Sequence, residues 1–428
     1  MIKKRIKNMT FLVWEKLFKL FLNLFWIALL SRYLGPEKFG EYSYLFALMI
    51  FFSILPQFGL DNVNLDHLID GKKKILKVSF LIRSALALFS AVIFFVYISV
   101  SEGKTDYITA LYIFLIFFSL NVDLIKNYHQ AYENTSRYIH LDNIAISIAL
   151  LIKMIMLKNE YINIPLLISL DYIAPFLLLL FFSRKLLLEL WSYNCVLIDL
   201  MRTIKIAFPF FISSLLVVIY TKIDQIMIKE LIGYKELGIY AASARISTAW
   251  WVIPTVLTVA FYPSFKKIYG LLPEKRIVSS YFSIILYSAL FCAIPIFFLA
   301  YFLIINIFGE QYIEAVNLVK MHCFVGCLAA LGVARSKWFI MENMQKYLPV
   351  FIGGGAVFNI VLNYFLIPKL GAYGAVLSTI AAQAAVQYIF PLFFESTRKS
   401  VSYCVYALFP NVLIYGVKNI ILGIKNEK

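Results

Sequence analysis

Twelve apolar runs of 17 to 29 residues dominate this sequence and restrict what the chain can fold into. A helix needs about 20 apolar residues to cross the roughly 30 Å hydrocarbon layer, and it satisfies its own backbone hydrogen bonds there. The runs therefore predict an all-α membrane protein with twelve transmembrane helices. They cover approximately residues 11–34, 43–60, 78–100, 107–126, 141–157, 162–183, 204–228, 237–262, 278–305, 313–341, 348–367 and 374–394.

The composition argues against a soluble protein and against an enzyme. The chain is 62% hydrophobic and 15% charged, whereas soluble domains are about 25% charged. The five cysteines form no C-x-x-C pair, and the four histidines lack the spacing of metal ligands. The sequence contains no phosphate-binding loop, no G-x-S-x-G motif and no H-E-x-x-H motif. We therefore expect no catalytic residue, no metal and no cofactor.

The distribution of basic residues orients the chain in the bilayer. The predicted inner segments carry 24 lysines and arginines, and the outer loops carry seven. This asymmetry predicts that both termini are cytoplasmic, and it accounts for most of the net charge of +16 without a nucleic-acid partner. Residues 401–423 are apolar but are interrupted by Pro410, Asn411 and Lys418. They predict an interfacial cytoplasmic tail, residues 401–428.

A short polar turn occurs twice, 198 residues apart. "SRYLGPEKFGEY" begins at Ser31, and "KELIGYKELGIY" begins at Lys229. Six predicted crossings separate the copies, so both lie on the same side of the membrane. The repeat predicts two parallel six-helix bundles, residues 1–190 and 191–400, around a central cavity. Four glycines are expected to form the hairpin turns, because glycine accepts positive φ angles: Gly35, Gly40, Gly233 and Gly238.

Basic residues within the predicted spans are candidates for a substrate cavity. A cation at the centre of a membrane helix costs about 2.5 to 3.5 kcal/mol unless water or a partner stabilises it. A surplus of such cations would attract an anion such as a phosphate or pyrophosphate group. The candidates are Arg245, Lys320, Arg335, Lys222 and Lys19, of which Lys19 is also spaced to pair with Glu15.

Acidic residues within the spans are candidates for ion coupling or for structural pairs. Asp224 and Arg245 lie at comparable depth on consecutive antiparallel helices, which predicts a salt bridge or a gated pair. Asp171 lies nine residues into the sixth span. Arg83 and Asp123 lie near the inner end of one hairpin and are expected to pair. The sequence leaves open whether protons or sodium ions drive any transport.

Three segments carry a resemblance to a known family. "SRYLGPEKFGEYSYLFALMIFFSILPQFGLD", "TKIDQIMIKELIGYKELGIYAASARISTAWWVIP" and "FNIVLNYFLIPKLGAYGAVLST" resemble, in this order, the polysaccharide-export and O-antigen flippase family. The resemblance implies transport of an undecaprenyl-pyrophosphate-linked oligosaccharide across the bacterial inner membrane by alternating access. It also implies polysaccharide polymerase and chain-length proteins as partners. Only the charged positions of the second segment are carried over: Lys222, Asp224 and Arg245.

Three alternatives stay open at this point. A cation-coupled drug exporter would be favoured by an acidic site in the first span, where this chain has only Glu15 near the inner end. A flippase for the peptidoglycan precursor would share the same architecture. A membrane polysaccharide polymerase would need a large outer loop with catalytic groups, whereas the predicted outer connections are about ten residues or fewer.

Overall fold

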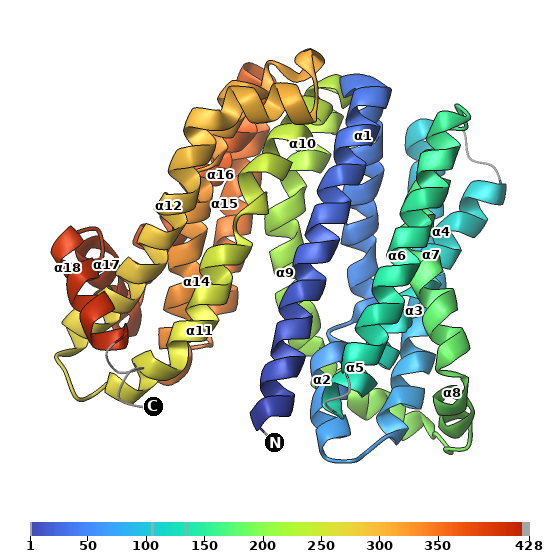
Figure 1. Ribbon diagram of the computed structural model, residues 1–428, viewed down its shortest axis with the longest axis horizontal. Coiled ribbons are helices and arrows are strands. Elements are labelled where there is room, and N and C mark those ends of the chain that lie inside the picture. The colour runs from blue at the N-terminus through green and yellow to red at the C-terminus, as the bar shows by residue number, and fades with distance from the viewer. Residues whose placement is uncertain (1, 104–106, 133–134, 422–428) are drawn as a thin grey trace. The chain divides into compact units, whose positions relative to one another are not determined.

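The computed structural model describes residues 2–103, 107–132 and 135–421, and the regular elements of these residues are all helical (Figure 1). The last residues of the predicted tail, 422–428, lie outside the described residues. The first half of the chain forms α1 (Ile2–Gln57), α2 (Leu60–Ile69), α3 (Lys74–Glu102), α4 (Tyr107–Ser119), α5 (Val122–Ala131), α6 (Thr135–Lys158), α7 (Ile164–Phe182) and α8 (Arg184–Trp191). The second half forms α9 (Leu197–Leu231), α10 (Tyr234–Ala249), α11 (Val252–Ile268), α12 (Glu274–Ile307), η1 (Glu310–Tyr312), α13 (Ala315–His322), α14 (Val325–Met341), α15 (Tyr347–Leu370), α16 (Ala372–Ala384), η2 (Ala385–Ile389), η3 (Phe390–Phe393), α17 (Glu395–Tyr406), α18 (Pro410–Gly416) and η4 (Val417–Ile421).

The predicted number of spans is confirmed by the described helices. Eleven helical segments are long and apolar enough to cross a membrane. One of them, Glu15–Gln57, has 43 residues and is broken at Gly35, where φ is 73° and ψ is 172°. Its two arms are each long enough to span the hydrocarbon layer, since a helix rises about 1.5 Å per residue. Counting the arms separately gives six spans before residue 190 and six after it.

Local sequence signals set several helix ends. Asn163 precedes α7, and its side chain accepts a hydrogen bond from the backbone N–H of Leu166 at 3.0 Å. This is a typical N-cap, because it satisfies an N–H group that has no partner within the helix. At the other end of a span, Gly103 terminates α3 with a left-handed φ of 68°.

The chain divides into two compact units. Unit 1 contains Met1–Leu29 and Leu45–Val218, and unit 2 contains Leu30–Tyr44 and Ile219–Lys428. This division differs from the boundary at residues 190 and 191 that the sequence predicts. The first reason is that α9 is continuous, so its beginning packs with unit 1 and its end with unit 2. The second is that the tip of the α1 hairpin packs with the helices of unit 2.

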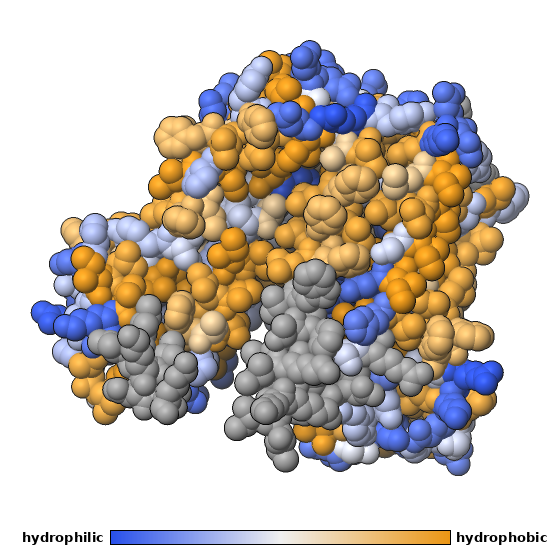
Figure 2. Space-filling model, in the orientation of Figure 1, coloured by the Kyte–Doolittle hydropathy of each residue, from blue (hydrophilic) through white to orange (hydrophobic). Residues whose placement is uncertain are grey.

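Each unit has its own apolar interior. In unit 1, α2, α3, α5 and α8 enclose a cluster that includes Leu60, Leu76 and Leu124. In unit 2, α12 and α14 run alongside each other and contribute Tyr281, Phe282 and other buried residues to a larger cluster (Figure 1). Hydrophobic residues also cover much of the helical surface in Figure 2. This pattern suits helices that are surrounded by lipid tails.

The residues after the twelfth span form a bent pair of short helices. The segments Glu395–Tyr406 and Pro410–Ile420 are inclined by 101° to each other. Both segments pack on α12, near its first residues (Figure 1). The break occurs at Pro410, one of the residues that interrupt the apolar pattern in the sequence. The interfacial position of this tail stays a prediction.

Candidate functional site

The two copies of the repeated turn lie in unit 2 and contact each other. A Cβ atom on Gly40 would lie 1.9 Å from the carbonyl oxygen of Tyr234, and a Cβ atom on Gly238 would lie 1.9 Å from that of Pro36. Pro36 and Tyr234 are themselves 198 positions apart, so the two contacts are equivalent under the sequence repeat. Glycine permits this close backbone approach between membrane helices.

Only one glycine of each copy acts as a turn residue. Gly35 joins the two arms of α1 with φ 73°, and Gly233 precedes α10 with φ 131°. Gly40 lies within α1 and Gly238 within α10, so the prediction that they form the turns is wrong. These two positions require glycine because a neighbouring backbone occupies the space of a side chain.

Unit 1 contains a half-open cavity of about 230 Å³ with charged walls. Lys153 Nζ donates a hydrogen bond to Asp171 at 2.7 Å and lies 4.3 Å from the centre of the Trp26 ring. The lysine side chain is 3% exposed and that of Asp171 is 29% exposed. Asp171 is therefore partnered by Lys153, which is not among the residues that the sequence analysis names. The lining residues are Lys19, Leu22, Asn23, Trp26, Phe46, Ile146, Leu150, Lys153, Asp171 and Tyr172.

Lys19 lines this cavity but is held by two acids. Its ammonium donates hydrogen bonds to Glu15, as its spacing predicts, and to Asp142, which the sequence analysis did not select. The Asp142 side chain is fully buried, and Lys126 Nζ lies 3.4 Å from it. The opposite charges around Lys19 offset its attraction for an anion.

The charged contacts continue along the same end of unit 1. Arg83 pairs with Asp61 and lies 3.7 Å from Asp123, so the predicted proximity of Arg83 and Asp123 is confirmed. Asp61 also accepts a hydrogen bond from the Asn127 amide at 2.7 Å. Lys126 and Asp123 are 3.9 Å apart and join this group to Asp142. The network ties α1, α2, α3, α5 and α6 together.

Asp224 lies at the centre of a polar cluster in unit 2. Its carboxylate accepts hydrogen bonds from the Asn363 amide at 2.7 Å, from the Thr379 hydroxyl at 2.7 Å and from the Tyr240 hydroxyl at 2.9 Å. Asn363 also donates to Asn359 at 3.0 Å. A carboxylate that is 4% exposed and surrounded by neutral donors can hold a proton or a small cation.

The described partner of Asp224 on α10 is Tyr240, and the predicted pair of Asp224 with Arg245 stays a prediction. Asp224 lies about eight residues before the turn that joins α9 to α10, and Tyr240 lies about as far after it. Arg245 is five residues beyond Tyr240, which corresponds to about 7 Å along the helix axis. The hydrogen bond from Tyr240 therefore comes from the same depth as Asp224, and the backbone of Arg245 lies further along α10.

Arg335 is buried among packed helices of unit 2. Its side chain donates hydrogen bonds to the backbone carbonyls of Val386 at 3.0 Å and Gln387 at 3.1 Å. Both carbonyls belong to the π-helical segment η2, where the hydrogen-bond ladder of α16 changes. Arg335 is 2% exposed, and its guanidinium also lies 5.4 Å from the Phe351 ring. This arrangement gives Arg335 a role in packing, and its predicted place in a substrate cavity stays a prediction.

The other basic candidates of unit 2 are partly exposed. Lys222 lies on α9, two residues before Asp224, and Arg245 lies on α10. Lys320 lies on α13 with its ammonium 5.9 Å from the centre of the Phe297 ring. Their role in substrate binding stays a prediction.

The chain is similar to one known protein family and to several solved structures. The family described as "Polysaccharide biosynthesis protein" matches residues 6–269. A structure of the lipid II flippase MurJ in an inward closed conformation has a TM-score of 0.69 at 15% identity, and covers 97% of this chain and 96% of its own. An inward-facing multidrug resistance MATE family transporter of the MOP superfamily has a TM-score of 0.64 at 13% identity, with the same coverage. At these identities the structures show a common fold. No curated protein matches the chain.

Proposed function

Because the chain belongs to the polysaccharide biosynthesis protein family, we propose that it is a flippase for a lipid-linked oligosaccharide. The substrate would be an undecaprenyl-pyrophosphate-linked glycan, which the protein moves from the inner to the outer leaflet of a bacterial inner membrane. The family match, over 264 of 428 residues, is the observation that carries this proposal. The twelve-span fold, which is similar to that of flippases and exporters, supports it.

In this proposal the protein performs no bond chemistry. The pyrophosphate headgroup is attracted by Lys222, Arg245 and Lys320, while the prenyl chain stays in the hydrocarbon layer. The glycan and the pyrophosphate are too polar to cross the layer without a polar route. The two bundles would expose this route to one leaflet and then to the other, as in alternating access.

Asp224 is the coupling residue of this proposal. The described contacts leave its carboxylate with three neutral donors and no basic partner, which favours binding of a proton or a small cation. Asp171 is a weaker candidate, since Lys153 already neutralises it. An ion that binds one conformation more tightly than the other shifts the balance between them.

A reconstituted flipping assay tests the proposal. Proteoliposomes would contain a fluorescent undecaprenyl-pyrophosphate oligosaccharide, lipid II or a cationic dye, and the amount that reaches the other leaflet would be measured. We expect movement of the oligosaccharide lipid, and a lower rate for Arg245→Ala and Lys320→Ala than for the control Lys266→Ala. Movement of only lipid II or only the dye would replace the proposal with the corresponding alternative. Undiminished rates for both cavity variants would remove the cationic route.

A further inference from the structure

The bent helix pair α17 and α18 encloses a polar cavity against the first turns of α12. The cavity has a volume of about 120 Å³ and opens to the surface. Tyr287 donates a hydrogen bond to the carbonyl of Leu408 at 2.8 Å, and Ser280 donates to that of Val412 at 3.3 Å. A Cβ atom on Gly416 would lie 2.9 Å from the carbonyl oxygen of Ser280, so α18 packs tightly on α12. These contacts hold α18 and the connection before it in place on α12, and so fix the wall of the cavity. Its lining residues are Arg276, Ser280, Tyr406, Asn411, Val412 and Tyr415.

Lys275 and Arg276 of α12 have no acidic partner among the described residues; Arg276 lines this cavity, and Lys275 lies beside Tyr406, which also lines it. Lys275 Nζ lies 5.0 Å from the centre of the Tyr406 ring, and the Arg276 guanidinium lies 6.0 Å from that of Tyr415. The adjacent acid, Glu274, is occupied by Lys399 at 2.7 Å. Each cation thus lies near an aromatic ring. This contact uses none of its N–H groups, which can still donate hydrogen bonds to a bound ligand.

Uncharged donors complete the cavity. Tyr406, Tyr415 and Asn411 line the same space as Arg276, and their hydroxyl and amide groups have no hydrogen-bond partner among the described residues. A guanidinium with several neutral donors matches a phosphate oxygen group, because charge-assisted hydrogen bonds to phosphate are strong and directional. A volume of about 120 Å³ suits a phosphate group and is too small for an oligosaccharide.

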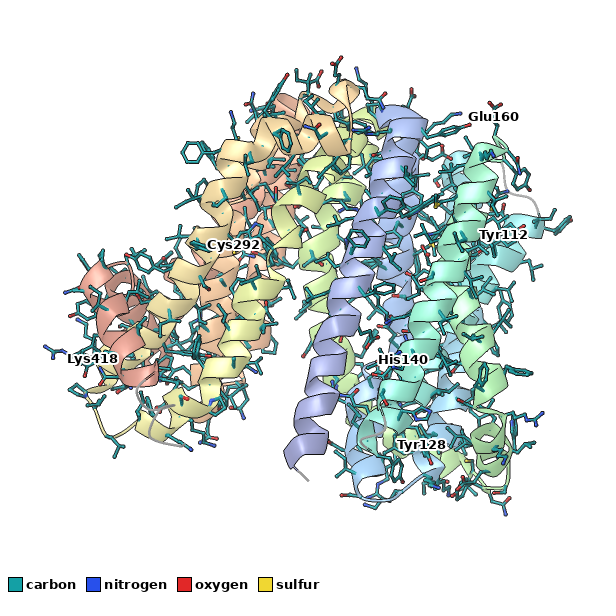
Figure 3. All side chains as sticks on the ribbon, viewed as in Figure 1. Tyr112, Tyr128, His140, Glu160, Cys292 and Lys418 are labelled. Carbon is teal, nitrogen blue, oxygen red and sulfur yellow. The ribbon has the colours of Figure 1, made fainter. Side chains whose placement is uncertain are left out.

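Three apolar side chains are exposed on α18 and on the connection between α17 and α18. Leu408 is 51% exposed, Phe409 is 53% exposed and Ile414 is 69% exposed. In Figure 2 hydrophobic and hydrophilic residues adjoin on the part of the surface that α17 and α18 form, and Figure 3 labels Lys418 on η4 at the same place. Exposed apolar residues beside cations and tyrosines are typical of a membrane interface.

We propose that Lys275, Arg276, Tyr406 and Tyr415 form a binding site for the phosphate of an anionic phospholipid. The acyl chains of this lipid lie against Leu408, Phe409 and Ile414. The bound lipid belongs to the bilayer and is not the transported substrate. It fixes the tail and the beginning of α12 to an anionic leaflet. The bend at Pro410 is what brings the two tyrosines to the same cavity.

Native mass spectrometry of the purified full chain tests this site. The protein would be titrated with phosphatidylglycerol and, separately, with phosphatidylcholine. The variant Lys275→Gln/Arg276→Gln removes both cations, and the matched control Lys266→Gln/Lys267→Gln removes the same charge from the end of α11. We expect the first variant to bind phosphatidylglycerol about 10- to 30-fold more weakly, since each cation near an anionic lipid contributes about fivefold. The control should change binding less than twofold.

A second variant separates the site from general electrostatic attraction. Tyr406→Phe/Tyr415→Phe keeps the rings and removes only the two hydroxyls. We expect this variant to bind phosphatidylglycerol three- to tenfold more weakly, with unchanged binding of phosphatidylcholine. Equal losses in the α11 control, or no loss in either site variant, would overturn the proposal. Full competition by inorganic phosphate would assign the site to a free anion, and full competition by the prenyl-pyrophosphate substrate would assign it to transport. Either result would also overturn it.

Discussion

Replacing Gly40 with alanine tests the contact between the two copies of the repeated turn. The new Cβ atom would lie 1.9 Å from the carbonyl oxygen of Tyr234, whereas ordinary contacts begin at 3.4 Å. The arm of α1 and α10 would have to separate by about 1.5 Å, since both atoms belong to rigid helical backbones. A gap of about 1 Å already removes up to half of a dispersion contact.

The substitution Gly40→Ala changes the free energy of unfolding by a small gain and a larger loss. Alanine in place of glycine stabilises a helix by about 1 kcal/mol. Overpacking costs about 1 to 3 kcal/mol, and the upper end applies here because two backbones have to separate, so we expect a net loss of about 2 kcal/mol. This loss corresponds to a decrease of about 4 to 8 °C in the unfolding temperature of a unit of this size.

Thermal unfolding in detergent, followed by tryptophan fluorescence, measures this decrease. Gly238→Ala should cost a similar amount, and the double variant should cost less than the sum, because one separation accommodates both methyl groups. Gly354→Ala in α15 is the matched control, since its Cβ would lie 3.0 Å from the end of the Phe390 ring, which can turn aside. If Gly40→Ala unfolds at the temperature of the control, the proposed contact is absent in solution.

Three further predictions concern charged groups. Arg335→Lys should destabilise unit 2 by about 2 kcal/mol in chemical denaturation, because an ammonium cannot bind two carbonyls as a guanidinium does; equal stability of the two proteins would contradict this. Lys153→Met and Asp171→Asn should each cost about 1 to 3 kcal/mol, and the double variant should recover much of the loss; strictly additive losses would show that the two residues do not interact. Asp224→Asn should remove any response of flipping to an imposed proton or sodium gradient while the uncoupled rate persists, and an unchanged gradient response in proteoliposomes would exclude Asp224 as the coupling group.

The spans and the repeat could be predicted from the sequence because both depend on local patterns. A run such as residues 348–367 has no other stable arrangement in lipid than a helix, whatever its neighbours are. The repeated glycines likewise indicated two related hairpins, and the structure places Gly35 and Gly233 at the bends. The residue spacing did not reveal that Gly40 and Gly238 serve a contact between helices, since this depends on how α1 and α10 approach each other.

Most contacts between charged and polar groups were decided only by the tertiary structure, and the pair of Lys153 and Asp171 is an exception. Lys153 and Asp171 lie nearly equally far from the turn between α6 and α7, so counting residues could have suggested their pair. Asp224 lies at the level of Tyr240, and its other partners come from α15 and α16, more than 130 residues away. Arg335 binds two carbonyls of the π-helical segment η2, more than 50 residues away along the chain. The length of an apolar run is a property of one segment. A contact between polar side chains depends on the depth and rotation of several helices at once.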